Sequence, residues 1–251
     1  MRIRRTHRWD VSVEEACRLQ RRLAAAVDTR ARLGRVRLVA GADAAYHRDG
    51  ERLIAAVVVL ALPGLEVVEA ASAAGRVEFP YVPGLFGFRE APIVLRACAQ
   101  LHARPDVLVC DGQGIAHPHR FGLACHLGYC LDLPTIGCAK SRLSGEHGPL
   151  AARRGSWAWL RDGGERLGAV LRTRDGVRPV YVSPGWAIGF RDARALVLAT
   201  SAGYRLPEPT RRANLLVNAL RRAVSPPPPP FSPPPPPSAP ASGRAACASG
   251  P

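Results

Sequence analysis

Val107-Leu-Val-Cys-Asp111-Gly-Gln-Gly114 is the stretch of this 251-residue chain that decides the fold. Its almost wholly apolar start predicts a short strand over residues 106–110, of the kind that is buried on both faces in a parallel sheet. The aspartate stands at the carboxyl end of that strand, which is where the sites of α/β proteins gather. The segment therefore predicts an α/β protein with a polar site at this end of the sheet.

The segments around this strand predict a mixed sheet flanked by helices. Residues 37–46, 53–62 and 65–77 are rich in Val, Ile, Leu and Ala and follow one another through short turns, which predicts an antiparallel meander. Further strands are expected over 135–139, 166–173 and 179–182. Helices are expected over 13–32, which opens on a capping box at Ser12, and over 91–102, 119–130, 192–201 and 209–223. The expected fold class is α/β, with the meander joined to a parallel β-α-β section.

The end of the chain has a different composition. Residues 226–237 contain ten prolines, and Ser, Ala, Gly and Pro fill most of the remaining positions. Such a segment has few apolar side chains to bury against the entropy lost on ordering. We therefore expect a single folded domain over 1–224 and a disordered, Pro-rich tail over 225–251. The tail is either a dispensable extension or a docking site for a reader of PxxP motifs.

The charge and the cysteines restrict the class of protein. The formal net charge is +15, which favours a polyanionic partner and nucleic acid above all. Lys140 is the single lysine among the 35 basic residues, so drift of the composition toward arginine is an alternative origin of the charge. No apolar run reaches 18 residues, no secretion signal opens the chain, and the seven cysteines form no CxxC. We expect a cytoplasmic protein with no membrane segment.

Three acidic residues are candidates for metal chemistry. Asp43 lies inside an otherwise apolar strand, Asp111 ends another strand, and Glu90 stands where a helix is expected to begin. A buried carboxylate is costly unless it is paired or binds metal, and hard oxygen ligands suit Mg²⁺. Together the three would make a site for metal-assisted phosphodiester hydrolysis. Taken singly, each acid is equally well a helix cap or a turn residue.

Two loops and one lysine complete the candidate residues. The segment 79–84 is aromatic and fixed by proline, so it is either a wedge that separates nucleic-acid strands or a buried connection. The Gly-rich segment 112–119 leads into a helix, and its N–H groups can cradle a phosphate or a base edge. Lys140 follows a strand and suits contact with a phosphate or a metal-bound water. The His and Cys residues near 117–130 fit no common zinc spacing.

A set of motifs now carries a resemblance to a known family. They are Val39–Asp43, Pro80–Glu90, Pro105–His119, Gly122–His126, Pro134–Leu143, Val182–Gly185 and Tyr204–Thr210. In this order, over roughly residues 7–222, the chain closely resembles the endonuclease V family. The resemblance implies an RNase H-like fold and hydrolysis of DNA at deaminated bases, deoxyinosine foremost. It implies Mg²⁺ as the cofactor, with Mn²⁺ as a substitute, and cutting at the second phosphodiester 3′ to the lesion, which leaves 3′-hydroxyl and 5′-phosphate ends.

The same resemblance assigns roles to residues of this chain. Asp43, Glu90 and Asp111 match the metal-binding carboxylates, and Lys140 matches the lysine of the catalytic site. Tyr81 matches the aromatic residue of the strand-separating wedge, whose loop also contains Pro83 and Gly84. The base pocket and its edge correspond to Gly112, Gln113, Gly114 and His117. The resemblance implies DNA with deaminated bases as the partner, and we expect a monomer.

Two positions depart from the family pattern. Trp186 stands where histidine usually follows the Val182–Gly185 motif, and Asn214 stands where His or Asp usually adds a contact at the metal site. Asparagine offers a carbonyl oxygen but brings no negative charge. Two alternatives to a DNA endonuclease therefore stay open. One is a protein that binds inosine-containing nucleic acid with weak or no cleavage, and the other is an endoribonuclease that acts on inosine in RNA.

Overall fold

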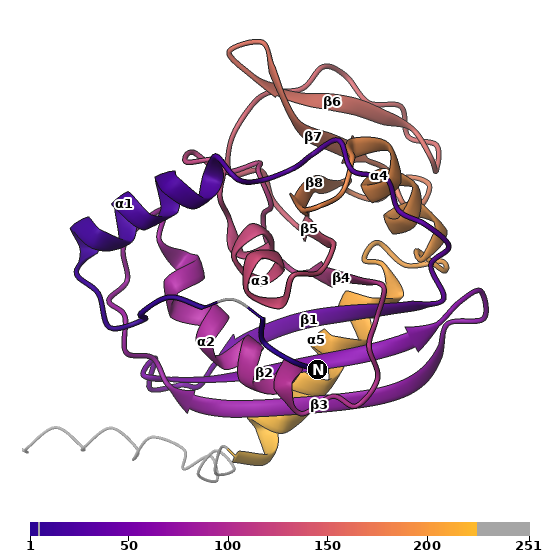
Figure 1. Cartoon of the computed structure of the whole chain (residues 1–251). Coiled ribbons are helices and arrows are strands. Elements are labelled where there is room, and N and C mark those ends of the chain that lie inside the picture. Colours follow the sequence, from indigo (N-terminus) through magenta and orange to yellow (C-terminus); the bar gives the residue numbers. More distant parts are fainter. Residues whose placement is uncertain (5, 225–251) are drawn as a thin grey trace, which may run out of the picture.

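Residues Val107–Cys110 form strand β4, with all four side chains buried near the middle of an eight-stranded sheet. The structure, a computed structural model, describes residues 1–4 and 6–224 (Figure 1). The sheet has the order β3-β2-β1-β4-β5-β8-β7-β6. The other strands are β1 (Leu38–Tyr46), β2 (Arg52–Ala61), β3 (Glu66–Arg76), β5 (Thr135–Ala139), β6 (Trp157–Asp162), β7 (Glu165–Leu171) and β8 (Val180–Trp186). The helices are α1 (Val13–Ala24), α2 (Phe86–Ala99), α3 (Leu123–Leu131), α4 (Phe190–Ala199) and α5 (Glu208–Val224).

The directions of the strands confirm the predicted mixed sheet. The strands β1, β2 and β3 form an antiparallel meander, while β4 is parallel to both β1 and β5. Beyond β5 the pairs β5–β8, β7–β8 and β6–β7 are antiparallel again. The parallel centre is the part that needs both faces covered, because its strands are apolar on both sides.

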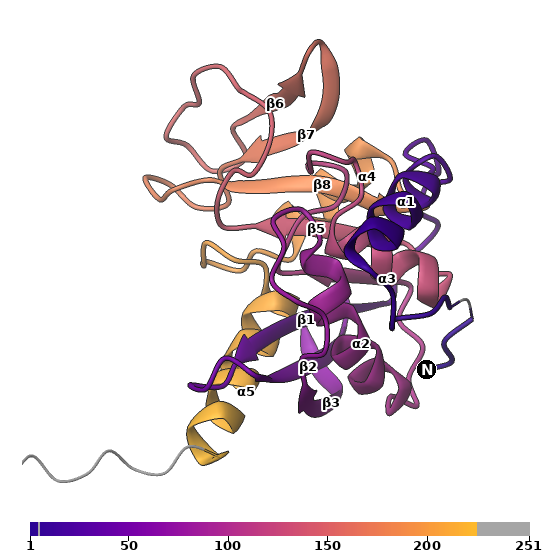
Figure 2. The same ribbon diagram turned by 90° about the vertical axis from the view of Figure 1, so that its left-hand side faces the viewer.

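Helices supply that cover on both faces. One large apolar cluster joins side chains of α2 and α3 to one side of the sheet, and a second joins α4 and α5 to the other side. Figure 2 shows α5 and α2 on opposite sides of β1 and β2. The sheet is therefore the middle layer, and polar groups at the ends of its central strands lie between the helical layers.

The parallel pairing of β1 with β4 decides where the candidate acids lie. Ala42 stands opposite Cys110 in this pairing, and the N–H of Asp111 donates to the carbonyl of Ala42 at 3.0 Å. The next residue of β1 is Asp43. The two aspartates predicted on adjacent strands therefore sit side by side, at the carboxyl end of β4.

The first helix is shorter than the predicted range 13–32. The capping box at Ser12 is present, as predicted, but α1 ends at Ala24. Further along, Asp28 accepts a hydrogen bond from the backbone N–H of Arg30 at 2.8 Å, a local turn that competes with helix. Aspartate offers this alternative to the backbone, so the apolar spacing alone overestimated the helix.

The starts of α2 and α3 were also predicted wrongly. Helix α2 begins at Phe86, five residues before the predicted start, so Glu90 lies inside the helix and does not open it. Glycine at 87 and proline at 92 are poor helix formers and hid this beginning. Helix α3 begins at Leu123 and not at 119, because Arg120 has a φ of 53° and Gly122 is the N-cap.

Strand β6 was not predicted, and neither was its hairpin with β7. Strand β6 pairs with β7 through the two-residue turn Gly163-Gly164, with positive φ at both glycines. Two glycines between strand-like segments are typical of a two-residue hairpin turn, because both turn residues adopt positive φ. Strand β8 also runs on to Trp186, through Pro184 and Gly185, past the predicted end at 182. Helix α2 ends at Ala99, three residues before the predicted end at 102, and the other boundaries lie within two residues of the prediction.

Two expectations about the whole chain remain. The Pro-rich tail predicted over 225–251 lies outside the described residues. Among residues 1–4 and 6–224, no helix is both long enough and apolar enough to cross a membrane.

Gly41 is the place where the backbone of α5 crosses β1 most closely. A Cβ at this residue would stand 1.9 Å from the carbonyl carbon of Pro209. We predict that Gly41→Ala lowers the free energy of unfolding by about 3 kcal/mol, because helix and strand must separate. Urea denaturation measures the loss. The control is Gly148→Ala, which has open space around the new methyl group and should change stability little. Equal stabilities of the two variants would contradict the prediction.

Candidate active site

Asp43 is a buried carboxylate that α5 helps to hold. It is 8% exposed, and its Oδ2 accepts a hydrogen bond from Nδ2 of Asn214 at 2.7 Å. Asn214 reaches it because α5 passes close over β1 at Gly41. The residue that departs from the family pattern thus contacts a candidate metal ligand directly, through its amide nitrogen.

Asp111 and Lys140 form an ion pair at the same place. The Nζ of Lys140 donates to Oδ2 of Asp111, and the lysine side chain stays partly exposed while the carboxylate is largely covered. Lys140 follows β5 and Asp111 follows β4, so the parallel pairing of these two strands brings the pair together. The chain's single lysine is therefore one of the candidate catalytic residues.

Glu90 enters the cluster from α2 and is 5% exposed. Burial, followed by the negative charges of Asp43 and Asp111, raises its pKa from 4.5 to about 8. Burial, followed by the charge of Asp111, raises the pKa of Asp43 to about 6, against the opposing hydrogen bond from Asn214. The three predicted carboxyls are thus close enough to repel one another.

The donor set fits a hard divalent cation, although the side chains do not form a closed metal cage. Within the described residues, no group of three or more His, Cys, Asp and Glu side chains is arranged to hold a metal ion. Asn214 and Lys140 instead offset the charges of Asp43 and Asp111. Carboxylate oxygens that need compensating charge are the ligands Mg²⁺ prefers, and that ion keeps several of its waters.

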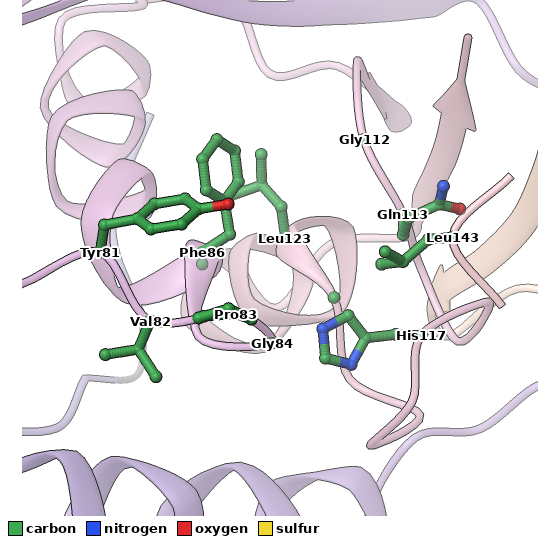
Figure 3. A pocket seen from close by; sticks show the side chains of 12 residues that line it. Tyr81, Val82, Pro83, Gly84, Phe86, Gly112, Gln113, His117, Leu123 and Leu143 are labelled. Carbon is green, nitrogen blue, oxygen red and sulfur yellow. The ribbon is translucent and has the colours of Figure 1, made fainter. Parts of the chain in front are cut away.

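A cavity of about 280 Å³ is lined by residues that neighbour Glu90 and Asp111 along the chain. Figure 3 shows its two walls, one from the loop at Tyr81–Gly84 with Phe86 and the other from the segment that contains Gln113 and His117. The first wall leads directly into α2, which contains Glu90, and the second follows Asp111 immediately. The two segments that form the cavity therefore also contain two of the three carboxyls, Glu90 and Asp111.

The structure brings most of the predicted nucleic-acid contacts to this cavity. Tyr81, Pro83, Gly84, Gly112, Gln113 and His117 line it. Gly114 is the exception, because it packs against β8 and its N–H donates to Oγ of Ser183 at 2.8 Å. A Cβ there would stand 1.9 Å from the carbonyl oxygen of Pro184. Gly114 therefore shapes the loop from behind.

Four apolar lining residues were not singled out from the sequence. They are Val82, Phe86, Leu123 and Leu143. Leu143 is 55% exposed and comes from the loop after β5, far along the chain from the other walls. An isolated leucine in a loop gives no sequence signal of its own, so this contact emerges only from the fold.

The polar lining residues have defined hydrogen-bonding states. Burial lowers the pKa of His117 to about 4, so its imidazole is neutral at neutral pH, and its Nδ1 accepts from the N–H of His119 at 3.1 Å. Gln113 donates through Nε2 to the carbonyl of Ser141, while its Oε1 is buried without a hydrogen-bond partner in the structure. Gln113, a lining residue, therefore has one buried acceptor that no group in the described residues satisfies.

Tyr81 stands out at the cavity mouth, with 71% of its surface exposed. The guanidinium of Arg89 lies between two rings, 5.8 Å from the centre of Tyr81 and 5.3 Å from that of Tyr46. Arg89 also donates to the carbonyl of Phe79 at 2.7 Å, which fixes the start of the loop. An exposed ring on an anchored loop suits the predicted wedge.

Trp186, the other departure from the family pattern, lies in the core. It is 8% exposed and packs edge-on against Tyr129 of α3, with 5.6 Å between ring centres. The backbone N–H of Trp186 donates to Oγ1 of Thr135 at 2.9 Å. The residue therefore joins β8 to α3 and β5.

A meander that runs into parallel strands, with aspartates side by side on two of those strands, defines an RNase H-like nuclease fold. The sequence profile of the Endonuclease V family matches residues 19–215. An endonuclease V from Roseiflexus castenholzii is 52% identical over 212 residues, which cover 84% of this chain and 95% of that protein. This chain belongs to the endonuclease V family, whose members are metal-dependent, deoxyinosine-directed endonucleases.

Solved structures agree with this assignment. The endonuclease V of Streptomyces avermitilis superimposes with a TM-score of 0.82 at 44% identity, covering 86% of this chain and 96% of that one. The Bacillus subtilis protein gives a TM-score of 0.85 at 30% identity, covering 89% of this chain and 98% of that one. The resemblance seen in the motifs and the predicted RNase H-like fold are both confirmed.

The raised pKa of Glu90 predicts how stability depends on pH without metal. Between pH 4.5 and 8 the folded protein keeps a proton that the unfolded chain releases, so stability falls as pH rises across this window. Glu90→Gln should flatten this decline by the equivalent of about one proton. Denaturant midpoints in EDTA from pH 5 to 8 measure it. The exposed Glu66→Gln serves as control, and an unchanged decline in Glu90→Gln would refute the assignment.

Proposed function

We propose that this chain hydrolyses DNA at deaminated bases, deoxyinosine foremost, with Mg²⁺ as cofactor and Mn²⁺ as a substitute. The proposed cut is at the second phosphodiester 3′ to the lesion, leaving 3′-hydroxyl and 5′-phosphate ends. The supporting observation is the adjacency of the cavity to the carboxyl cluster, because Gly112 and Gln113 follow Asp111 directly. Recognition of a base and attack on the nucleic-acid backbone would then depend on one continuous segment of the chain, residues 111–113.

The chemistry is divided among four side chains. Asp43 and Asp111, with Glu90 beside them, would hold the divalent ion, which supplies activation of a water and neutralisation of phosphate charge. Glu90 is buried in α2 and would add a third carboxyl to the surroundings of that ion. Lys140 offsets negative charge at the scissile phosphate. Its exposed position beside Asp111 supports this role.

Recognition requires the damaged nucleotide to leave the helix. The cavity would take the extruded base, and Tyr81 would fill the gap from its anchored loop. Pro83 and Gly84 shape that loop, and Gly112, Gln113 and His117 face the base. Surface arginines would hold the strand through contacts with phosphate that weaken as salt is raised. Mismatched or single-stranded lesions should be favoured, because extruding them costs less.

The remaining features of the proposal concern the whole chain. We propose that residues 1–224 form the catalytic unit, that 225–251 form a tail outside it, and that the enzyme acts as a cytoplasmic monomer. RNA that contains inosine is the second candidate substrate, since neither the cavity nor the carboxyls contain a feature that excludes a 2′-hydroxyl. Competition between matched DNA and RNA strands decides between them.

The first test is cleavage of a labelled strand with one deoxyinosine. The wild-type protein with Mg²⁺ should give one product, and EDTA should abolish it. Asp111→Ala should lower the rate at least about a thousandfold, as is common for loss of a metal ligand that acts in the transition state. Product that persists undiminished in Asp111→Ala, or binding to the lesion with no product at all, would defeat the proposal.

Asn214→Asp tests the contact that departs from the family pattern. A carboxylate beside Asp43 adds negative charge, so half-maximal cleavage should need about tenfold less Mg²⁺. Asn214→Leu is the contrasting variant, because it removes the hydrogen bond to Asp43 and adds no charge. Rates measured over a Mg²⁺ series compare them. If Asn214→Asp needed more Mg²⁺ than the wild type, residue 214 would not belong to the metal site.

A further inference from the structure

Gln20 occupies the middle of the buried face of α1. That face consists of Ala16, Gln20 and Leu23, which recur at helical spacing, and Gln20 is only 3% exposed. A polar side chain at a core position is costly unless its hydrogen bonds are satisfied. Apolar spacing favours a residue such as leucine at this position. A glutamine here must therefore be stabilised by its hydrogen-bond partners.

The side chain of Gln20 makes three hydrogen bonds. Its Nε2 donates to the carbonyl oxygen of Gly84 at 2.8 Å and to that of Phe121 at 2.9 Å. Its Oε1 accepts from Nδ1 of His119 at 2.6 Å. Two carbonyls can only accept, so the amide has one satisfactory orientation. Every partner lies far from Gln20 in sequence, in one of two separate loops.

Each of these bonds holds one wall of the cavity. Gly84 lines the first wall itself. On the second wall, Phe121 precedes the lining residue Gly122, and the N–H of His119 donates to the ring of the lining residue His117. Gln20 therefore links the walls that Figure 3 shows facing each other across the cavity.

The apolar contacts of α1 follow the same division. Ala16, one turn before Gln20, packs with Phe79, Leu85 and Phe88 at the first wall. Leu23, one turn after it, packs with Ile115, Phe121 and Cys125 at the second wall. Such contacts are non-directional and tolerate sliding, whereas hydrogen bonds fix distance and angle. Gln20 supplies the directional part of the link.

We propose that Gln20 is a positioning residue that sets the separation of the two walls and, through it, the preference of the cavity for inosine over undamaged bases. This inference rests on the proposed function and deepens it. A flat base needs walls at one fixed spacing. If the link is lost, the walls relax apart, and the bonds that distinguish inosine from guanosine lengthen while the general attraction to the backbone remains.

The experiment measures two affinities for each variant in EDTA. One probe is a single strand with one deoxyinosine, and the other is the same strand with deoxyguanosine at that place. The dissociation constant for the deoxyguanosine strand divided by that for the deoxyinosine strand reports selectivity, and a lower ratio means weaker preference for inosine. Gln20→Glu keeps the shape but cannot donate to the two carbonyls, and Gln20→Met keeps the length without polar atoms. Both should lower the ratio about tenfold, the usual effect of leaving a buried hydrogen-bonding group unpaired.

Two controls separate positioning from general stability. Leu23→Ala weakens the packing of α1 but leaves the three hydrogen bonds, so it should lower the melting temperature and leave the selectivity ratio unchanged. Gln100→Met removes a glutamine that donates to the carbonyl of Ser72 at 3.0 Å, on the far end of α2, and should change neither the ratio nor cleavage. His119→Leu removes one of the three bonds and should give a smaller loss of selectivity.

The outcomes distinguish the inference from the function on which it rests. In cleavage assays the Gln20 variants should raise KM for the inosine strand more than they lower kcat. If the wild type shows no preference for inosine, both the proposed function and the inference fall. If the wild type prefers inosine and the folded Gln20 variants keep that preference, or if Leu23→Ala loses it equally, the inference alone is overturned. Should Gln20→Met fail to fold, Gln20→Glu and His119→Leu decide.

Discussion

The structure depends on one unfavourable interaction, the repulsion between carboxylates on neighbouring parallel strands. The hydrogen bond from Asp111 to the carbonyl of Ala42 forces Asp43 and Asp111 together, and the fold cannot separate them without breaking the centre of the sheet. Burial, and after it the charge of Asp111, raises the pKa of Asp43. Without metal, the amide of Asn214 and the ammonium of Lys140 offset part of that charge. A divalent cation would offset it better, which is why a site of this kind is both a cost to folding and a source of affinity.

The same part of the sheet connects the cavity proposed to bind the base with the carboxyls proposed to act on the backbone. Asp111 ends β4, and the next residues turn away from the sheet into the Gly-rich segment that forms one wall of the cavity. Glu90 lies in α2, whose first residues belong to the other wall. Any movement that opens the cavity therefore moves the backbone that positions a carboxylate. Under the proposed function, a base that fits poorly would leave the carboxyls poorly placed, so selectivity in binding and selectivity in cutting would follow from one geometry.

The sequence predicted the sheet better than the helix ends, and the reasons are physical. Strand 107–110 is apolar throughout and bounded by Asp106 and Asp111, so its extent can be read locally. Helix ends depend on competition, as at Asp28, where a side chain captures a backbone N–H, and at Arg120, where the backbone adopts a positive φ. Gln20 and Leu143 were missed because their importance lies in partners far away in the chain. Asp43 and Asp111 were found because an acid in an apolar strand is conspicuous on its own.

Lys140 shows how a biased composition can still be informative. The chain has arginine at every other basic position, and arginine tolerates most surface roles because it remains charged and can pair with two acceptors. Lys140 pairs with Oδ2 of Asp111, and a compact ammonium can approach one carboxylate oxygen without covering its neighbour. A planar guanidinium would engage both oxygens of Asp111 and leave none for a cation. A lysine at this position is therefore compatible with the proposed cation at Asp111, whereas an arginine would compete with it.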